Sequence, residues 1–406
     1  MRAFPASYVG SKTIMASPSA GTAAGKTPKL IFLVTEDWYF WAHRLPQARA
    51  ARDAGFAVSV ATRVDAHGDL IRGEGFALHP LAWRRGSVNP FAALSSVLEI
   101  ARLYWRERPS IVHHVSQKPI LLGSIAARLA KATRIVNALT GLGFLFVAAT
   151  PKARLVRAVL LPILRNIASR PQVRFLVENP DDGMMLKRLN IVPDHRIVLI
   201  KGSGVDVEYY QPLSEPPGPV VIGCAARMLR IKGVEEVVAA FRVLRAGGSD
   251  ARLLLAGAPD PENPAAISQA ELSAWGAEPG VEWVGHVSDV RQVWARAHIA
   301  VLASRGGEGI PMTLMEAAAC ARPLVATDVP GCREVVVPEK TGLLAPPNDP
   351  AALAQALRRM VEDADFRRRC GLAARERVMH GLDAGTVGRE TVAVYRALLA
   401  AKPNPQ

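Results

Sequence analysis

The stretch Lys29-Leu-Ile-Phe-Leu-Val-Thr35 decides the fold that this sequence predicts. It is a short apolar run that ends in a polar loop, which is typical of a strand buried on both faces of a parallel sheet. We expect a helix from about Trp41 to Ala54, ended by Gly55, and a second strand at Ala57–Thr62. This strand–helix–strand order is the unit from which doubly wound α/β domains are built.

The same alternation continues along most of the chain. Further strands of the first half are expected at 110–115, 134–137, 174–178 and 196–200. The proline-rich stretch Gln211–Pro219 predicts a linker. Strands after it are expected at 220–225, 251–256, 281–284, 299–303 and 323–327, with a last helical region over 350–401. The sequence therefore predicts two α/β, Rossmann-like doubly wound domains that face a cleft, where ligands bind beyond the carboxyl ends of the strands.

Four segments divide the 406 residues, which are more than a single core usually supports. Residues 1–28 are rich in Ala, Ser, Gly and Thr with scattered Lys, and we expect them to form a disordered leader. They lack the apolar core of a secretory signal, so secretion is not expected. An N-terminal domain is expected over 29–212 and a C-terminal domain over 213–385. Residues 386–406 are expected to form a C-terminal helix and tail that can pack back on the N-terminal domain.

The formal net charge is +14, and the isoelectric point is near 10. This excess of Lys and Arg predicts an anionic partner, which can be a nucleic acid, an acidic membrane surface or a phosphorylated substrate. The sequence has no helix-turn-helix pattern, RNP-like strand or Cys/His finger, so no nucleic-acid partner is expected. No stretch reaches the ~18 uncharged apolar residues that a membrane span needs.

The four cysteines, at positions 224, 320, 332 and 370, show no Cys-x-x-Cys spacing. A disulfide scaffold or a zinc site is therefore not expected, and a reducing compartment such as the cytoplasm is the simpler interpretation.

The sharpest chemical signal is Ser304-Arg-Gly-Gly-Glu-Gly-Ile-Pro-Met-Thr-Leu-Met-Glu316. A helix is expected to begin near Pro311, since proline suits the first helical position, and its first N–H groups suit an anion. Such a helix can turn the carboxylates of Glu308 and Glu316 towards one ligand. A tight turn followed by a solvated helix face is the alternative interpretation.

In this region the chain resembles the family-4 retaining glycosyltransferases of the GT-B fold. That family has a Glu-x7-Glu loop between a strand, here Ala300–Ser304, and a Pro-Leu-Val-Ala-Thr-Asp strand, here Pro323–Asp328. Val329-Pro-Gly-Cys-Arg-Glu334 and Thr341-Gly-Leu-Leu344 follow in the family's order. The resemblance extends over nearly the whole chain from about Lys29, and it implies a nucleotide-sugar donor in the C-terminal domain and an acceptor in the N-terminal one.

The resemblance gives the donor-site residues their roles. Glu308 would orient the donor sugar as a catalytic residue, and Glu316 would hold the ribose. Arg227 and Lys232 match the Arg and Lys that the family places on the donor diphosphate, where cations stabilise the leaving group. Two surface cations are the alternative. The other expected donor-binding residues are Gly285, His286 and Val287 of the base-binding turn, and Gly309, Ile310, Pro311 and Met312 of the loop.

His113 and His114 end an expected strand that should point at the cleft. The family often has a histidine there that touches the transferred sugar, commonly the second of a His-x-His pattern, but Val115 occupies that place. We prefer His114 as the catalytic residue, with His113 as its rival. A hydrogen-bonded core histidine is the alternative for either.

The first strand–helix loop departs from the family, because Thr35-Glu-Asp-Trp-Tyr-Phe-Trp41 replaces a common Gly-Gly pair. Its acids and aromatic rings suit a saccharide or an amphipathic acceptor, although an aromatic core edge with exposed acids has the same composition. The expected acceptor-binding residues are Glu36, Asp37, Trp38, Tyr39, His113, Lys118 and Gly141.

The segments Ser116–Pro119, Thr140–Phe144 and Asn179–Asp182 look like the subgroup that extends polyprenyl-diphosphate-linked sugars in bacterial surface polysaccharide or glycoprotein pathways. The stretch Lys152–Arg170 is a basic amphipathic helix, although Pro162 can kink it. It predicts peripheral contact with an anionic membrane surface, on the inner face of the plasma membrane. A Rossmann helix that packs on the sheet is the alternative.

The resemblance implies transfer of a hexose or N-acetylhexosamine with retention, from a UDP-linked donor and with no cofactor or metal. Asp363-Ala-Asp365 has a DxD spelling, but it lies in the last helical region. One rival function is a GT-B sugar-nucleotide epimerase, for which the first domain offers only Glu36 and Asp37 as acid/base groups. The other rival is a catalytically dead sugar-nucleotide-binding protein, which the intact donor motifs disfavour.

Overall fold

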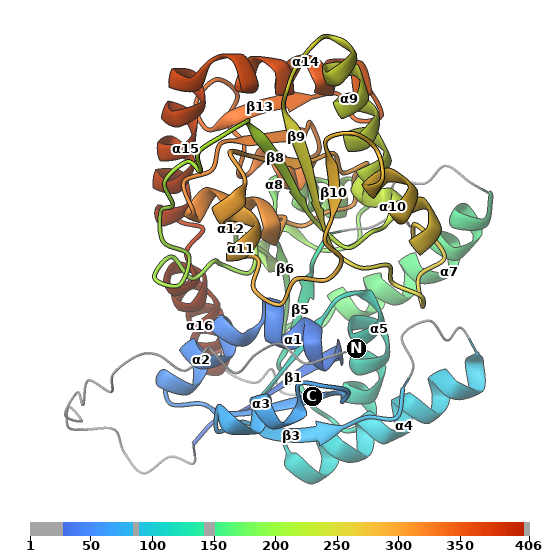
Figure 1. Cartoon of the computed structure of the whole chain (residues 1–406). Coiled ribbons are helices and arrows are strands. Elements are labelled where there is room, and N and C mark those ends of the chain that lie inside the picture. Colours follow the sequence, from blue (N-terminus) through green and yellow to red (C-terminus); the bar gives the residue numbers. More distant parts are fainter. Residues whose placement is uncertain (1–26, 84–88, 142–150, 402–406) are drawn as a thin grey trace, which may run out of the picture. The chain divides into compact units, whose positions relative to one another are not determined.

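The computed structural model describes residues 27–83, 89–141 and 151–401 (Figure 1). The chain divides into two compact units, one made of residues 1–137 and 392–406 and the other of residues 138–391. Within the described ranges, no helix is both long and apolar enough to cross a membrane.

The first half of the chain builds a seven-stranded sheet in the order β3-β2-β1-β4-β5-β6-β7. Its strands are β1 Lys29–Glu36, β2 Ala57–Arg63, β3 Ala77–Pro80, β4 Ile111–Val115, β5 Ile135–Leu139, β6 Val173–Val177 and β7 Ile197–Leu199. The helices of this half are α1 Asp37–His43, α2 Leu45–Asp53, α3 Gly68–Gly73, α4 Pro90–Glu107, α5 Gln117–Leu129, α7 Pro151–Ala168 and α8 Pro180–Arg188, with the 3-10 turn η1 Asp194–Arg196.

Strand β1 is the buried centre that its sequence predicted. Its residues from Leu30 to Val34 are at most 1% exposed. Phe32 lies opposite Val60 of β2 on one side and His113 of β4 on the other, and both pairings are parallel. The strand order reverses between β1 and β4, and such a switch point leaves a crevice at the carboxyl ends of the strands.

The helix expected from Trp41 to Ala54 is in fact two helices. The first, α1, begins four residues earlier, at Asp37, and ends at His43. The second begins at Leu45 with a proline in its first turn. Pro46 lacks an N–H and restricts the residue before it, so a single continuous helix is disfavoured here. Helix α3 and strand β3 were also missed, because each is too short for a periodic pattern.

The second sheet has six strands in the order β10-β9-β8-β11-β12-β13, again with parallel pairings. Its strands are β8 Val221–Ala225, β9 Arg252–Ala256, β10 Val281–Trp283, β11 Ile299–Leu302, β12 Leu324–Thr327 and β13 Gly342–Ala345. The helices of this half are α9 Val234–Ala246, α10 Gln269–Gly276, α11 Arg291–Arg296, α12 Met312–Ala319, α13 Pro330–Arg333, α14 Pro350–Glu362, α15 Ala364–Met379 and α16 Ala384–Ala400, with the 3-10 turn η2 Arg230–Lys232.

Strand β13 was quoted as a motif in the sequence but was not predicted to be a strand. Its first residue shows why a glycine stands there. A Cβ at Gly342 would lie 1.8 Å from the carbonyl oxygen of Leu324 on the neighbouring strand. The edge strand can therefore approach β12 only without a side chain at this position.

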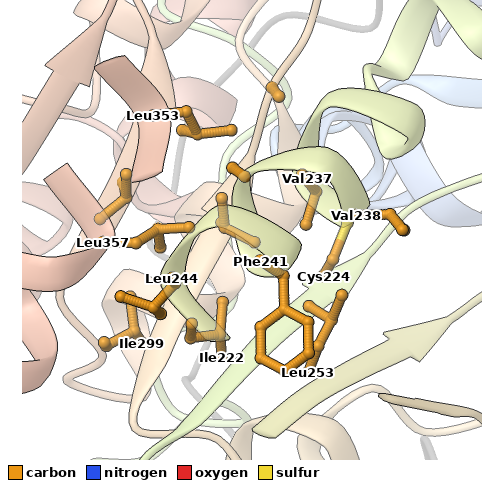
Figure 2. Close-up of a cluster of buried hydrophobic side chains, with 14 of the residues drawn as sticks. Ile222, Cys224, Val237, Val238, Phe241, Leu244, Leu253, Ile299, Leu353 and Leu357 are labelled. Carbon is orange, nitrogen blue, oxygen red and sulfur yellow. The ribbon is translucent and has the colours of Figure 1, made fainter. Parts of the chain in front are cut away.

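One face of the second sheet is covered by α9 and α14, which pack on each other. Phe241 and Leu244 of α9 lie among Ile222 of β8, Leu253 of β9 and Leu357 of α14 (Figure 2). These side chains are at most 1% exposed. Their burial removes apolar area from water and stabilises this unit.

The helical region predicted over 350–401 consists of three helices, α14, α15 and α16. Asp363 separates α14 from α15 and accepts a hydrogen bond from the Phe366 N–H as the cap of α15. Within the first unit, Tyr395 of α16 is fully buried, and its hydroxyl lies 2.6 Å from His113 Nδ1. The strands of the first sheet end at Leu199 and those of the second begin at Val221. The boundaries expected at 212/213 and 385/386 stay predictions.

The Phe241→Ala variant should lower the free energy of unfolding of the second unit by about 3–5 kcal/mol, because it leaves a cavity in the core. Val243→Ala on the same helix is the matched control, since Val243 is exposed and should change stability by less than about 0.5 kcal/mol. Urea unfolding followed by circular dichroism measures both. Equal losses in the two variants would contradict the packing described here.

Candidate functional site

The glycine-rich loop lies where the sequence predicted it, between β11 and α12. Pro311 is the residue before the first turn of α12, and Glu316 lies inside that helix. Ser304 is fully buried at the end of the strand, and its carbonyl oxygen accepts a hydrogen bond from the Thr327 hydroxyl of β12 at 2.5 Å. Thr313 fixes the start of α12 by donating to the carbonyl oxygen of Ala225 at the end of β8, at 2.7 Å.

An ion pair between Lys232 and Glu308 joins two of the predicted donor-site residues. Lys232 Nζ lies 2.6 Å from Glu308 Oε1 and 2.8 Å from Oε2. The Ser304 hydroxyl also donates to Oε1, at 3.0 Å. The side chains of Lys232 and Glu308 are 18% and 14% exposed, so the pair is largely shielded from water but reachable. Because β8 and β11 are neighbours, their carboxyl-end loops bring these two charges together.

The backbone of η2 approaches the end of β11 very closely. Gly233 has φ +70°, and a Cβ there would lie 1.7 Å from the carbonyl oxygen of Ala303. The N–H of Arg305 donates to the carbonyl oxygen of Ile231 at 2.9 Å. Only glycine fits at position 233, and this contact sets the distance at which Lys232 meets Glu308.

Three further residues hold the other side of the loop, all within the second unit. Glu178 follows β6, is buried, and accepts a hydrogen bond from the Ile310 N–H at 3.1 Å. A Cβ at Gly331 would lie 1.5 Å from the carbonyl oxygen of Gly309, and one at Gly141 would lie 2.5 Å from that of Gly307. Gly141 was expected to bind the acceptor, and its described contacts are with this loop. Glu178 was not predicted, because its partner is far away in the sequence.

Glu316 occupies a different environment from Glu308. The Tyr210 hydroxyl donates to Glu316 Oε1 at 3.1 Å. Desolvation by the surrounding protein raises the pKa of Glu316 to about 7, and the negative charge of Asp289 acts in the same direction. The hydrogen bond from Tyr210 opposes this rise because it stabilises the ionised form. Tyr210 was not predicted as a site residue, because no local pattern marks it.

The remaining donor-site residues lie on loops of the second sheet. Arg227 follows β8, is exposed, and pairs with Asp260 at 3.3 Å. Gly285, with φ +69°, has open space where a Cβ would be, and its carbonyl oxygen accepts the Gly257 N–H at 2.7 Å. His286 beside it is exposed, and Val287 packs partly on the core. The open space beside Gly285 and the exposure of His286 are compatible with a base-binding turn, and that role stays a prediction.

Both candidate histidines of the first unit are core residues. His114 is fully buried, with Nδ1 2.9 Å from Asn137 Oδ1 and Nε2 3.1 Å from the Tyr104 hydroxyl. Burial lowers the pKa of His114 to about 4, so the ring is neutral at physiological pH. His113 is 1% exposed and bonds to Tyr395, and burial lowers its pKa well below the ordinary range. The hydrogen-bonded core histidine is thus what the structure shows, and contact of either ring with a sugar stays a prediction.

The acidic pair at the end of β1 has two different environments. Asp37 is fully buried, and its carboxylate accepts the backbone N–H groups of Trp38, Asp65 and His67 at 2.7–2.8 Å. Asp37 therefore fixes the loop after β2. The sequence had predicted only that Asp37 contacts the acceptor. Glu36 instead forms an ion pair, with its Oε1 3.7 Å from Nη1 of Arg63.

The other expected acceptor residues lie near Glu36. Burial lowers the pKa of Lys118, and the charge of Glu36 opposes that shift, which indicates that the two side chains are close. Trp38 and Tyr39 stack edge to face on α1 with ring centroids 5.6 Å apart, and both are half-buried. The rings and charges expected to bind the acceptor thus lie at the carboxyl end of the sheet, and binding of a saccharide there stays a prediction.

Within the described residues, no group of three or more His, Cys, Asp and Glu side chains could hold a metal ion. Asp363 and Asp365 of the DxD spelling are used by α15, as its cap and in an ion pair with Arg368.

Comparisons with known proteins find family models that match both halves of the chain. Residues 29–170 match the family described as glycosyl transferase 4-like, and residues 219–363 match glycosyl transferases group 1. The two segments together make up most of the chain.

One relative is the N,N'-diacetylbacillosaminyl-diphospho-undecaprenol alpha-1,3-N-acetylgalactosaminyltransferase of Campylobacter jejuni. It is 26% identical over 338 residues, which cover 80% of this chain and 87% of the relative. The capsular polysaccharide biosynthesis glycosyltransferase CapM of Staphylococcus aureus is 24% identical over 76% of this chain and 82% of its own length.

Solved structures share the whole fold. Sucrose-phosphate synthase from Thermosynechococcus elongatus has a TM-score of 0.77 at 21% identity, covering 92% of this chain and 100% of that one. Anabaena HepE in complex with UDP-glucose has a TM-score of 0.73 at 17% identity, and the match covers 91% of this chain and 99% of HepE.

The fold and the donor-site motifs define a nucleotide-sugar glycosyltransferase of the GT-B class. The chain belongs to the family-4 type of these enzymes, as the match of both halves to glycosyl transferase families shows.

The Gly331→Ala variant should displace the glycine-rich loop, because the added methyl group collides with backbone that cannot rotate away. We expect a loss of about 1–3 kcal/mol in the free energy of unfolding. Amide NMR shifts at residues 307–310 should also change.

The matched control is Gly183→Ala in α8, where a Cβ would meet only ordinary contacts at 3.6 and 3.7 Å. This variant should keep the stability and the loop signals of the parent. An unchanged loop spectrum in Gly331→Ala would contradict the close approach of Gly331 to Gly309.

Proposed function

We propose that the protein is a retaining glycosyltransferase that moves a hexose or N-acetylhexosamine from a UDP-linked donor to a polyprenyl-diphosphate-linked saccharide. The single observation that carries the donor half is the shielded Lys232–Glu308 pair at the carboxyl ends of β8 and β11. The acceptor half draws support from the Campylobacter jejuni relative, whose printed name specifies an undecaprenyl-linked acceptor.

In this proposal the charges of the site act on the donor. Lys232 and Arg227 hold the diphosphate, together with the N–H groups at the start of α12, and stabilise the charge that develops as it leaves. Glu308 orients the transferred sugar, and Glu316 accepts hydrogen bonds from the ribose. No metal is needed, because these cations and N–H groups supply the positive potential.

The proposed reaction proceeds on one face of the sugar. The acceptor hydroxyl attacks the anomeric carbon from the side that the diphosphate leaves. Its proton passes to the departing phosphate oxygen. This route needs no protein base, which suits a site where burial keeps both His113 and His114 neutral and hydrogen-bonded.

The epimerase alternative requires a free acid or base in the first unit. The carboxylate of Asp37 already accepts three backbone N–H groups. Glu36 is buried, and its Oε1 lies 3.7 Å from Nη1 of Arg63. The engagement of both carboxylates by the protein supports our proposal of transfer over epimerisation.

Peripheral attachment to the inner face of the plasma membrane is part of the proposal. The helix predicted over Lys152–Arg170 is α7, which runs from Pro151 to Ala168. Arg165 donates to the carbonyl oxygens of Leu189 and Asn190 at the end of α8, and Ile167 is buried. The C-terminal part of α7 thus packs on the protein. The side chains of Lys152 and Arg154 lie outside the described part, so a membrane role for this helix stays a proposal.

The proposed function is tested by saturation-transfer NMR with a panel of UDP-, GDP- and ADP-sugars, with and without vesicles that carry a polyprenyl-diphosphate-linked sugar. We expect selective binding of one UDP-sugar, and transfer only when the lipid-linked sugar is present. Binding of no nucleotide-sugar would leave a protein that shares only the fold with the enzymes.

The Glu308→Gln variant should fold normally, bind nucleotide, and lose about 100-fold or more in kcat, because a positioned charge at the reacting centre is neutralised. Initial-rate measurements with the donor that binds in the panel check this. Glu339→Gln is the matched control, since Glu339 is an exposed partner of Arg359. Turnover at the parental rate in Glu308→Gln would refute the assignment of this carboxylate.

The raised pKa of Glu316 gives donor binding a pH dependence. If the ribose hydroxyls donate to the carboxylate, a pKa of about 7 should weaken donor affinity about tenfold between pH 8 and pH 6. Tyr210→Phe should move the midpoint to higher pH, because the bond that favours the ionised form is lost. Isothermal titration calorimetry across this range measures both.

The Glu316 carboxyl also makes the free energy of unfolding depend on pH, and this dependence runs in the opposite direction to that of donor affinity. Since the folded pKa lies above the ordinary value of 4.5, protonation favours the folded chain. This stabilisation is complete below pH 4.5 and is lost as pH rises through about 7. Glu316→Gln should remove both dependences, and a binding profile that stays pH-dependent in that variant would assign the titration to another group.

A further inference from the structure

Helix α4 exposes an unusual row of large apolar side chains. Phe91 is 81% exposed and Trp105 is 68% exposed, and Leu94 and Leu98 between them are also exposed. Most other large apolar side chains of the described chain are buried, and single exposed ones need no explanation. Four on one helix form a patch, and such patches mark interaction surfaces.

The four side chains lie on one side of the helix. Their spacing of three, four and seven residues keeps them within a narrow arc at 100° per residue. The opposite side packs inward, because Val97, Ile100 and Leu103 are buried. We call the outer side the α4 face, defined by Phe91, Leu94, Leu98, Arg102 and Trp105. Helix α5 packs against α4 (Figure 1). It also has two exposed apolar side chains, Ile125 and Leu129.

The charge around the α4 face is positive and lacks acidic partners. Arg102, Arg128 and Lys131 are exposed, and none of them forms an ion pair with a residue that the structure describes. The two acids of α4 are engaged elsewhere. Glu99 accepts the Ala82 N–H, and Glu107 pairs with Lys29 and Arg106. Helix α5 itself contains no acidic residue.

We propose that the α4 face docks on an anionic membrane surface. Exposed Trp and Phe beside Arg and Lys suit the boundary between lipid headgroups and acyl chains, where the rings insert and the cations meet phosphate. A second copy of the chain is a poorer occupant, since a two-fold interface would place these unpaired cations against each other. The choice of a membrane as the partner depends on the proposed function, in which the acceptor is lipid-linked. The existence of a docking surface is argued from the exposure and charge of its residues alone.

Vesicle flotation tests this proposal with the full chain and no substrate. The protein should float with vesicles of phosphatidylglycerol and phosphatidylcholine, and float much less with phosphatidylcholine alone. Phe91→Ser combined with Trp105→Ser should weaken binding to the anionic vesicles about tenfold or more, because two inserting rings are lost. Arg102→Glu should weaken it further and reduce its salt dependence.

The matched control is Leu372→Ser, which removes a side chain of α15 that is 67% exposed. It should float like the parent, and the variants should keep the parental circular dichroism because the changed side chains are exposed. Equal flotation of parent and Phe91→Ser/Trp105→Ser protein would overturn the proposal. Sedimentation that shows a parental dimer, lost in the same variant, would also overturn it and assign the face to a second copy.

Activity separates this inference from the proposed function. The double variant should transfer sugar normally to an acceptor with a short, water-soluble lipid tail, and poorly to an acceptor embedded in vesicles. If the parent floats but transfers no sugar to any lipid-linked acceptor, the proposed function fails and the docking surface stands. If the parent transfers sugar but does not float, the docking surface fails alone.

Discussion

The close approach of two backbone segments, η2 with Gly233 and the end of β11 with Ala303, is the constraint on which the donor site depends. It leaves no room for a Cβ at position 233. It also brings Lys232 to within hydrogen-bonding distance of Glu308, 76 residues further along the chain. A salt bridge that is largely shielded from water is favourable only when its geometry is held by other contacts. Here the parallel neighbours β8 and β11 and the Ser304 hydroxyl hold it.

The glycine-rich loop is held from its other side by contacts of the same kind. Gly331 touches the carbonyl oxygen of Gly309, and Glu178 accepts the N–H of Ile310. Glycine usually gives the backbone conformational freedom, but here its lack of a side chain allows two backbone segments to pack closely. A loop fixed on both sides presents its carboxylate and the first turn of α12 without reorganisation, which is what electrostatic stabilisation of a leaving group requires.

The first unit uses its polar residues differently. His113, His114 and Asp37, which all attract attention in the sequence, are buried and hydrogen-bonded to the protein itself. They fix β4, α16 and the loop after β2 and leave half-buried Trp38, Tyr39 and Lys118 at the carboxyl end of the sheet. In the proposed function, these aromatic faces and few charges are the groups left to recognise an acceptor. The apolar and basic α4 face is a separate feature of the same unit.

The sequence by itself determined the two α/β domains and the strand–loop–helix around Glu308, because buried strands and glycine-rich loops leave local patterns. The donor-binding roles of the residues in that loop stay predictions. The sequence could not show which buried polar groups are satisfied by the fold. Glu178 and Tyr210 act on partners 132 and 106 residues away, so no local pattern marks them. The environment of His114, the pKa of Glu316 and the exposure of α4 were likewise decided by tertiary packing, since burial and desolvation depend on what the chain folds against.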